Sequence, residues 1–183
     1  RGWAGVYWQN PANNWGSKKG GFDLTGLNKL IFWARGEKGG EIISKFTVGG
    51  IKGTYPDTTE VTFGPVELTS SWQQYTVNLV GKDLSYINGA FNWVIAADSN
   101  PEGATFYIDD IRFEYDANLK NEGKKSQEMP FYIYADRGSI SNHFIPSGWM
   151  GDSSDLKIDT GSAENPYFGK SCLKITYLNK ASN

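Results

Sequence analysis

The sequence predicts an all-β protein whose strands form a sandwich of two sheets. Aromatic residues are abundant, with 7 Trp, 10 Tyr and 10 Phe beside 22 Gly among 183 residues, a composition typical of strands joined by tight turns. Runs of alternating apolar and polar residues recur, separated by clusters of Gly, Pro, Asn and Asp. Helical periodicity is confined to short pieces such as DLSYI. These patterns indicate a sandwich of jelly-roll type.

The predicted strands are short runs rich in β-branched and aromatic residues. Before residue 117 they are GWAGVYWQ (2–9), KLIFWARG (29–36), EIISKFTVGG (41–50), SWQQYTVNLV (71–80), AFNWVIAAD (90–98) and ATFYIDDIRF (104–113). After residue 130 they are PFYIYADR (130–137), DLKID (155–159) and KSCLKITYL (170–178).

Alternation assigns the two faces of the first strand, because successive side chains of a strand point to opposite sides. One set is apolar and is expected to face the core: Ala4, Val6 and Trp8. The other set mixes rings with an amide and a glycine: Trp3, Gly5, Tyr7 and Gln9. The second set suits a sugar-binding face better than a core.

Two further strands follow the same reasoning. In LIFWARG the core set is Leu30, Phe32 and Ala34, which leaves Trp33 and Arg35 pointing outward. In FNWVIAAD two arrangements stay open. The exposed row is either Trp93 or the set Asn92, Val94 and Asp98.

The segment ATFYIDDIRFEYD (104–116) has the pattern of a closing strand, yet 67 residues follow it. Phe106, Ile108 and Ile111 would face one side and Thr105, Tyr107 and Asp109 the other, but Asp110 breaks the alternation. Two interpretations of the carboxylate pair are open. It is either a solvated strand end or part of a calcium site, because calcium takes clustered oxygen ligands.

A change of composition separates two parts of the chain. Residues 117–130, ANLKNEGKKSQEMP, are polar and charged and are interpreted as a linker between 1–116 and 131–183. The second part is too short to bury a stable core alone. We therefore expect residues 1–183 to form a single domain in which both parts share one sandwich.

Charge and hydropathy exclude some partner classes. The net charge is -2, whereas nucleic-acid binding normally needs a basic face. No apolar run approaches the roughly 20 residues that cross a bilayer, so we expect no membrane partner. The single cysteine, Cys172, lies in the apolar run SCLKITYL and is expected in the core.

The motifs, taken in rotated order, resemble a known family. FYIYADRG, SGWMGD and GKSCLKITY lie at the end of the chain, whereas GWAGVYWQ, LIFWARG and FYIDDI precede them. Read from FYIYADRG onward, the order is similar to that of jelly-roll carbohydrate-binding modules of secreted bacterial glycanases. The resemblance covers nearly everything outside the linker. It implies a circularly permuted, galactose-binding-like sandwich in which residue 183 adjoins residue 1, or a slice through tandem repeats.

The resemblance also implies a ligand, a metal and a location. Such modules are secreted and bind polysaccharides without catalysis, here a β-linked plant or microbial glucan, xylan or mannan. One structural calcium is expected on Asp109, Asp136 and the backbone carbonyl of Lys170, where YADRG, YIDDI and FGK would meet. The expected state is a monomer, and the linker also permits a dimer that swaps its C-terminal strands.

The residues chosen for sugar contact provide flat rings and polar groups. Rings stack on the C–H faces of pyranoses, and amides bond their hydroxyls. Two loops, NPANNWGSKKGG (10–21) and HFIPSGWMGD (143–152), add tryptophans to the face of the first strand. The predicted carbohydrate-binding residues are Trp3, Tyr7, Gln9, Asn14, Trp15 and Trp149.

An enzyme and a spacer domain are the alternatives. His143 is the only histidine and is placed in a loop, so a triad that needs histidine has one candidate. The 20 Asp and Glu residues form no recognisable acid and nucleophile motif for glycoside hydrolysis. We therefore expect a noncatalytic binding module, with a polysaccharide lyase, a glycoside hydrolase or a structural spacer of a larger secreted protein as alternatives.

Overall fold

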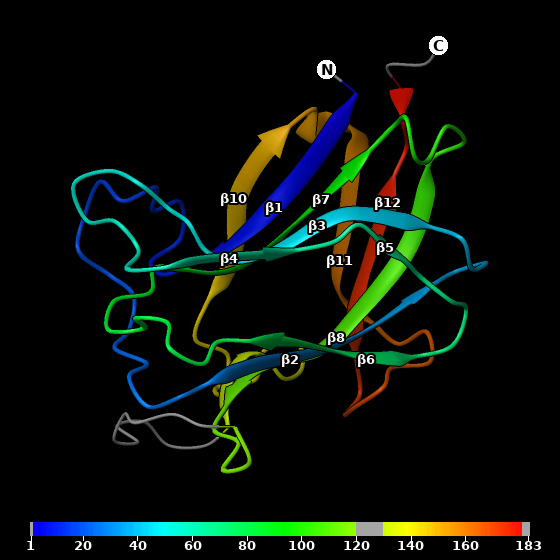
Figure 1. Ribbon diagram of the computed structural model, residues 1–183. Helices are drawn as coiled ribbons and strands as arrows, with labels where there is room; N and C mark the ends of the chain where they lie inside the picture. Colours follow the sequence, from blue (N-terminus) through cyan, green and yellow to red (C-terminus); the bar gives the residue numbers. More distant parts are fainter. Residues whose placement is uncertain (1, 120–129, 181–183) are drawn as a thin grey trace.

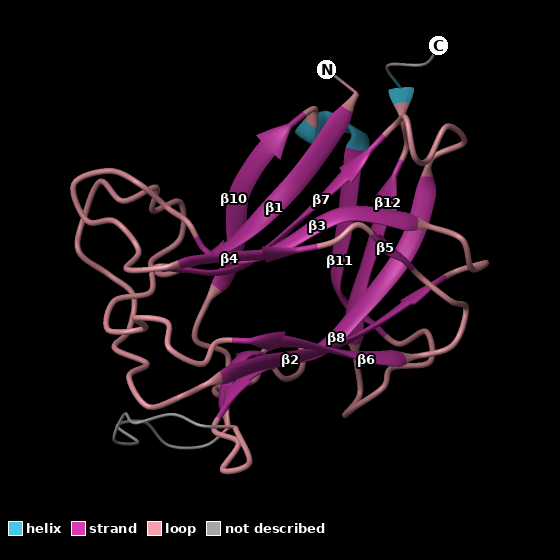
Figure 2. Cartoon of the chain, in the orientation of Figure 1, coloured by secondary structure: helices cyan, strands magenta, loops and turns pink. Residues whose placement is uncertain are grey.

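The computed structural model describes residues 2–119 and 130–180. In these residues two antiparallel sheets pack face to face as a sandwich (Figures 1 and 2). The predicted all-β, two-sheet fold is confirmed. No helix in this part of the chain is long and apolar enough to cross a membrane.

The first sheet has the strand order β10-β1-β7-β3-β4, with β5 beside β3. Its strands are β10 (Ile145–Gly151), β1 (Trp3–Gln9), β7 (Gly89–Ala96), β3 (Ile42–Gly49), β4 (Glu60–Phe63) and β5 (Val66–Glu67). The second sheet has the order β11-β12-β8-β2-β6, with β9 beside β8. Its strands are β11 (Leu156–Ser162), β12 (Cys172–Tyr177), β8 (Ala104–Glu114), β2 (Lys29–Gly36), β6 (Gln73–Asn78) and β9 (Phe131–Tyr134).

The core lies between the sheets and confirms the predicted faces of β1 and β2. Ala4, Val6 and Trp8 belong to the core, as does the predicted set of β2. In β7 the open choice is settled because Trp93 is fully buried in the core. Asn92 therefore points outward from the first sheet, where it pairs across the strands with Tyr7.

A bulge in β8 explains why two aspartates interrupt its alternation. Trp33 of β2 pairs with Asp109, and Ile31 pairs with Arg112, so the register shifts between these pairs. Asp110 has a φ of 50°, the left-handed conformation that a bulge residue adopts. The core set then resumes with Ile111.

Strands from both parts of the chain are members of both sheets. β10 pairs with β1 in the first sheet, and β12 pairs with β8 in the second. Of the predicted linker, residues 120–129 lie outside the described residues. The permuted order remains a prediction.

The first and last described residues are tied to one short segment. The Gly2 N–H donates to Asp152 Oδ2 at 2.7 Å, and the Lys180 N–H donates to Asp155 Oδ2 at 2.9 Å. Asp152 precedes the 3-10 turn η1 (Ser153–Asp155), and Asp155 is its last residue. The start of β1 and the end of β12 consequently lie at the same end of the sandwich (Figure 1).

Candidate functional site

A hollow of about 210 Å³ lies on the outward face of the first sheet. We call it the β1 groove, and its lining residues are Trp3, Tyr7, Lys45, Asn92, Val94 and Met150. They come from four neighbouring strands, β10, β1, β7 and β3. Two of the predicted sugar-contacting rings, Trp3 and Tyr7, thus lie in one groove.

Gly5 lies on β1 between these two rings, where the neighbouring strands pack closely against it. A Cβ at this position would lie 2.4 Å from the Trp93 carbonyl oxygen and 3.1 Å from side-chain carbons of Val94 and Met150. Trp3 and Tyr7 are four residues apart on one strand, a separation of about 13 Å. The glycine is buried, and the side chains of Val94 and Met150 occupy the space beside it.

Tyr7 is the most firmly held ring of the groove. Its hydroxyl donates to the Gly49 carbonyl at 3.0 Å, and its side chain is largely buried. Burial, followed by the charges of Asp57 and Glu60, raises the pKa of Tyr7 above its usual range. The hydroxyl therefore stays protonated and keeps donating at physiological pH.

Trp15 extends the aromatic surface beyond the groove. Its ring meets Tyr7 edge-on, with centroids 5.6 Å apart, and 43% of the residue is exposed. Asn14, which was predicted to contact sugar, is fully buried. Its Oδ1 accepts the Gly16 N–H at 3.1 Å and its Nδ2 donates to the Lys18 carbonyl at 2.8 Å. Asn14 shapes the loop that presents Trp15.

Gln9 is also fully buried, although it lies in the outward set of β1. The Ser147 hydroxyl donates to Gln9 Oε1 at 2.9 Å, and the Asn13 N–H donates to the same hydroxyl at 2.9 Å. Gln9 thus fastens the Trp15 loop to β10. In this structure it presents no surface to a ligand.

Trp149 lies on the other side of the first sheet. It pairs with Val6, a core residue, whereas Tyr7 pairs with Gly148. Because directly paired residues share a face, Trp149 points away from the β1 groove. Its placement in a loop was wrong: it belongs to the edge strand β10, and as an edge residue it keeps 46% of its surface exposed.

The groove also contains residues that the sequence reasoning did not select. Val94 and Met150 reach it because β7 and β10 flank β1, and Lys45 reaches it from β3, the next strand beyond β7. Alternation places Lys45 opposite to the core residue Phe46. That signal was present in the sequence, but the strand order that brings Lys45 to Tyr7 was not.

The three predicted calcium ligands meet at one turn. Asp109 is fully buried, and its Oδ2 accepts the Phe168 N–H at 2.9 Å. Asp136 Oδ2 accepts the Lys170 N–H at 3.0 Å, and the Ser171 hydroxyl donates to its other oxygen. Burial raises the pKa of Asp109 to about 7, although backbone N–H groups bond it.

The chemistry of this turn fits a calcium ion in part. Asp109 and Asp136 provide two carboxylates, and calcium takes 6–8 oxygen ligands. Within the described ranges no group of three His, Cys, Asp or Glu residues is arranged to hold a metal. Further ligands would have to be carbonyl oxygens or water. Lys170 is bonded to Asp136 through its N–H.

Residues 163–171, which we call the strap, cover the outward face of the second sheet. Tyr167 stacks on Trp33 with centroids 3.7 Å apart, and Trp72 Nε1 donates to the Asn165 carbonyl at 2.9 Å. Arg35 lies over the Tyr107 ring at 3.7 Å. The outward aromatics of this sheet are thus occupied by the chain itself.

His143 packs against aromatic residues rather than facing solvent alone. Its ring stacks on Phe131 with centroids 3.9 Å apart, and its Nδ1 lies 2.8 Å from the Tyr132 carbonyl oxygen. Both contacts are typical of a residue that holds a loop in place.

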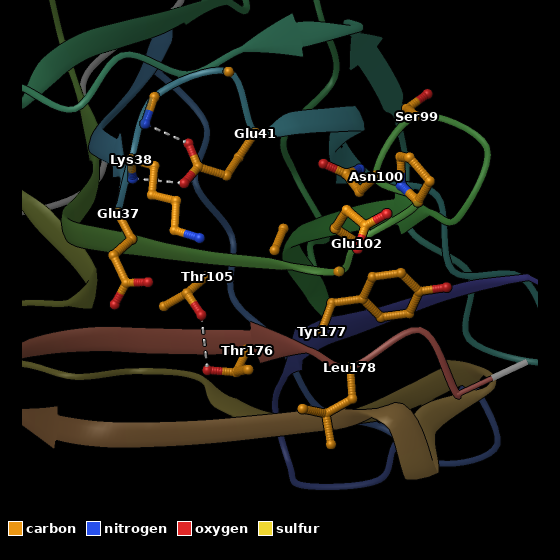
Figure 3. Close-up of a pocket in the computed structure, with 15 residues that line it drawn as sticks. Glu37, Lys38, Glu41, Ser99, Asn100, Glu102, Thr105, Thr176, Tyr177 and Leu178 are labelled. Atoms are coloured by element: carbon orange, nitrogen blue, oxygen red, sulfur yellow. Dashed lines mark hydrogen bonds between the residues drawn. The ribbon is translucent and has the colours of Figure 1, made fainter. Parts of the chain in front are cut away.

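A larger cavity, of about 400 Å³, lies at the end of the sandwich between the β2–β3 and β7–β8 connections (Figure 3). Figure 3 shows the Glu41 carboxylate bonded to the N–H groups of Lys38 and Gly39, at 2.8 and 2.9 Å. Thr105 and Thr176 bond each other through their hydroxyls at 3.3 Å. Its one aromatic residue, Tyr177, is only 1% exposed. The cavity lacks an accessible ring for stacking.

Comparison with family models, curated proteins and solved structures gives no match for this chain.

Proposed function

We propose that the protein is a noncatalytic module that binds a polysaccharide chain in the β1 groove. The observation that supports this most is a groove lined by Trp3 and Tyr7, with the exposed ring of Trp15 in contact with Tyr7. Rings provide stacking surfaces for pyranose faces, and the exposed ammonium of Lys45 in the groove provides a donor for hydroxyls. A β-linked glucan, xylan or mannan is the expected ligand class.

Ring truncation tests this proposal with a matched control. Trp3→Ala and Trp15→Ala each remove a ring beside Tyr7, and each should cost about 1–3 kcal/mol in binding free energy. Trp149→Ala is the control, because Trp149 is as exposed as Trp15 but points away from the groove. Affinity electrophoresis against soluble glucans, xylans and mannans measures the change. Unchanged affinity in both groove variants would overturn the proposal.

The noncatalytic part of the proposal needs its own measurement. Incubation with each bound polysaccharide should release no reducing ends and no unsaturated products. Either product would identify a hydrolase or a lyase instead.

We also propose that one calcium ion binds where Asp109 and Asp136 meet the strap. The support is a fully buried carboxylate, Asp109, placed on the same turn as a second carboxylate. A buried charge without a counter-charge is costly, and a cation would remove that cost. Bound there, calcium would hold the strap to β8 and would not touch the sugar.

A further inference from the structure

We propose that the β1 groove prefers polysaccharides whose rings carry carboxylates, and that Lys45 is the residue that selects them. This inference rests on the proposed function and adds the chemical class of the sugar. The observation behind it is the position of one ammonium group among the groove-lining side chains.

Lys45 lies on β3, is exposed, and lines the groove together with Trp3, Tyr7 and Asn92. Salt bridges in the described part of the chain hold Lys29, Lys52, Arg112 and Lys174. None of them involves Lys45. Its charge is therefore available to a ligand in the groove.

Two acidic side chains near Tyr7, Asp57 and Glu60, already have partners. The charges of both carboxylates raise the pKa of Tyr7, which places them in its surroundings. Glu60 pairs with Lys52 at 3.2 Å. Asp57 accepts the N–H groups of Ile51 and Asn88 at 2.9 and 2.6 Å. Neither carboxylate is turned to Lys45 as an ion-pair partner.

The Trp15 loop carries two further lysines. Lys18 and Lys19 are exposed, and no ion pair of theirs occurs among residues 2–119 and 130–180. Asn14 bonds the Lys18 carbonyl, so the backbone of this pair belongs to the loop that carries Trp15 to Tyr7. Although the chain has a net charge of -2, Lys45, Lys18 and Lys19 form no ion pair with an acidic group among the described residues.

A uronic acid matches this arrangement in its chemistry. Its pyranose ring offers a C–H face to Trp3 or Tyr7, and its carboxylate at the ring edge accepts a charge-assisted hydrogen bond from an ammonium group. A lysine is a point charge on a flexible stem, so it selects a carboxylate without fixing one ring geometry. A neutral sugar keeps the stacking and loses only the charged contact.

The test compares one sugar backbone with and without its carboxylates. The probes are cellohexaose and the same β-1,4-glucan oligomer oxidised at C6 to glucuronate, titrated calorimetrically at about 20 and 200 mM salt. We expect the oxidised oligomer to bind up to about fivefold tighter at low salt, the range of a surface ion pair. The advantage should shrink at high salt, because salt screens exposed charges.

Matched lysine variants assign the preference to a residue. Lys45→Gln should remove the advantage of the oxidised oligomer, so that the variant binds the two oligomers with equal affinity. Lys157→Gln is the control: Lys157 is an exposed strand lysine in β11 of the other sheet, and the substitution changes net charge equally. Its preference should match the parent.

The outcomes separate this inference from the proposed function. Equal affinity for the two oligomers, or equal effects of Lys45→Gln and Lys157→Gln, would overturn the inference alone. Absence of binding to both oligomers and to the whole panel of glucans, xylans and mannans would overturn the proposed function, and the inference with it.

Discussion

Gly5 stands at a point of β1 where the backbone of β7 and two side chains already fill the surrounding space. A Cβ there would meet the Trp93 carbonyl oxygen at 2.4 Å. Backbone cannot give way as a flexible side chain can, so any substitution must move the strands apart. The close packing of β10, β1 and β7 therefore depends on the absence of a side chain at this position.

Gly5→Ala should lower the free energy of unfolding by about 1–3 kcal/mol, the usual cost of overpacking, and should also weaken polysaccharide binding. Gly161→Ala is the matched control, because the nearest atom to its added Cβ belongs to the Arg137 side chain, which can move. Urea unfolding of both variants measures the difference. Equal stability of the two variants would show that β1 and β7 tolerate the extra carbon.

Asp57 provides a pH test of the loop beside Tyr7. Burial raises its pKa, while the N–H groups of Asn88, Ile51 and Gly89 oppose the rise. The pKa of Asp57 is therefore higher in the folded state than in the unfolded state, where it is about 3.9. The stability that protonated Asp57 contributes is fully present below the unfolded-state pKa, and it is lost as pH rises through the folded-state pKa.

As pH rises from about 4 towards neutral, the parent should lose the stability that protonated Asp57 contributes, whereas Asp57→Asn has no group there to titrate. The difference in stability between parent and variant should therefore become smaller. Thermal unfolding of parent and variant across this range measures the gap between them. A gap that stays constant, or that widens with pH, would contradict the assignment. The variant is expected to be less stable throughout, because an amide replaces one of two acceptor oxygens.

The strap is held on the outward face of the second sheet by contacts with β8 and β2. The bulge at Asp110 leaves Asp109 outward of the core, where it bonds the strap at Phe168. The strap in turn lays Tyr167 on Trp33. Asp109 therefore connects the bulge of the central strand β8 to the strap that covers the outward face of this sheet.

Calcium should raise the melting temperature of the parent, because an ion that binds only the folded state stabilises it, by about 2.7 kcal/mol at 100 times its Kd. Asp136→Asn should abolish this rise, since it removes one of the two carboxylates at the strap. Calorimetric scans with calcium, with magnesium and with a chelator measure it. Identical melting with calcium and with chelator would rule the site out.

The sequence predicted interior strands better than edge strands. Interior strands β1, β2 and β8 could be assigned by alternation, because a buried face imposes a period of two. The edge strand β10 contains Pro146, Gly148 and Gly151, residues that edges tolerate and that resemble a loop in sequence. Gln9 could not be assigned to packing, because its cover comes from Ser147, 138 residues away.

At the level of the whole molecule, neither part of the chain completes a sheet alone. β10 closes the first sheet against β1, and β12 lies beside β8 in the second. The core collects residues from both parts, among them Trp8, Phe106, Leu173 and Ile175. Sequence predicted this sharing from the shortness of residues 131–183. The residues that line the β1 groove could not be predicted from the sequence, because they are brought together by the order of strands that are distant in the chain.

A protease site placed in residues 120–129 tests the shared core. After cleavage, the two fragments should stay together and run at 20.3 kDa, because each contributes strands to both sheets. Light scattering coupled to size exclusion measures the mass before and after the cut. Separation into two species would show that the fragments fold independently, and twice the mass would indicate strand exchange between two copies.

Gly2 and Lys180 are both hydrogen-bonded to residues 152–155, and this placement determines how the sandwich responds to mechanical force. Tension applied between these two residues meets β1 and β12 at the same end of the molecule. Each strand is then peeled from its neighbours, so its ladder hydrogen bonds are loaded one after another instead of together in shear. The protein should unfold at low force when it is pulled at these two residues. It should resist a much larger force when it is pulled between opposite ends of the sandwich, parallel to the strands.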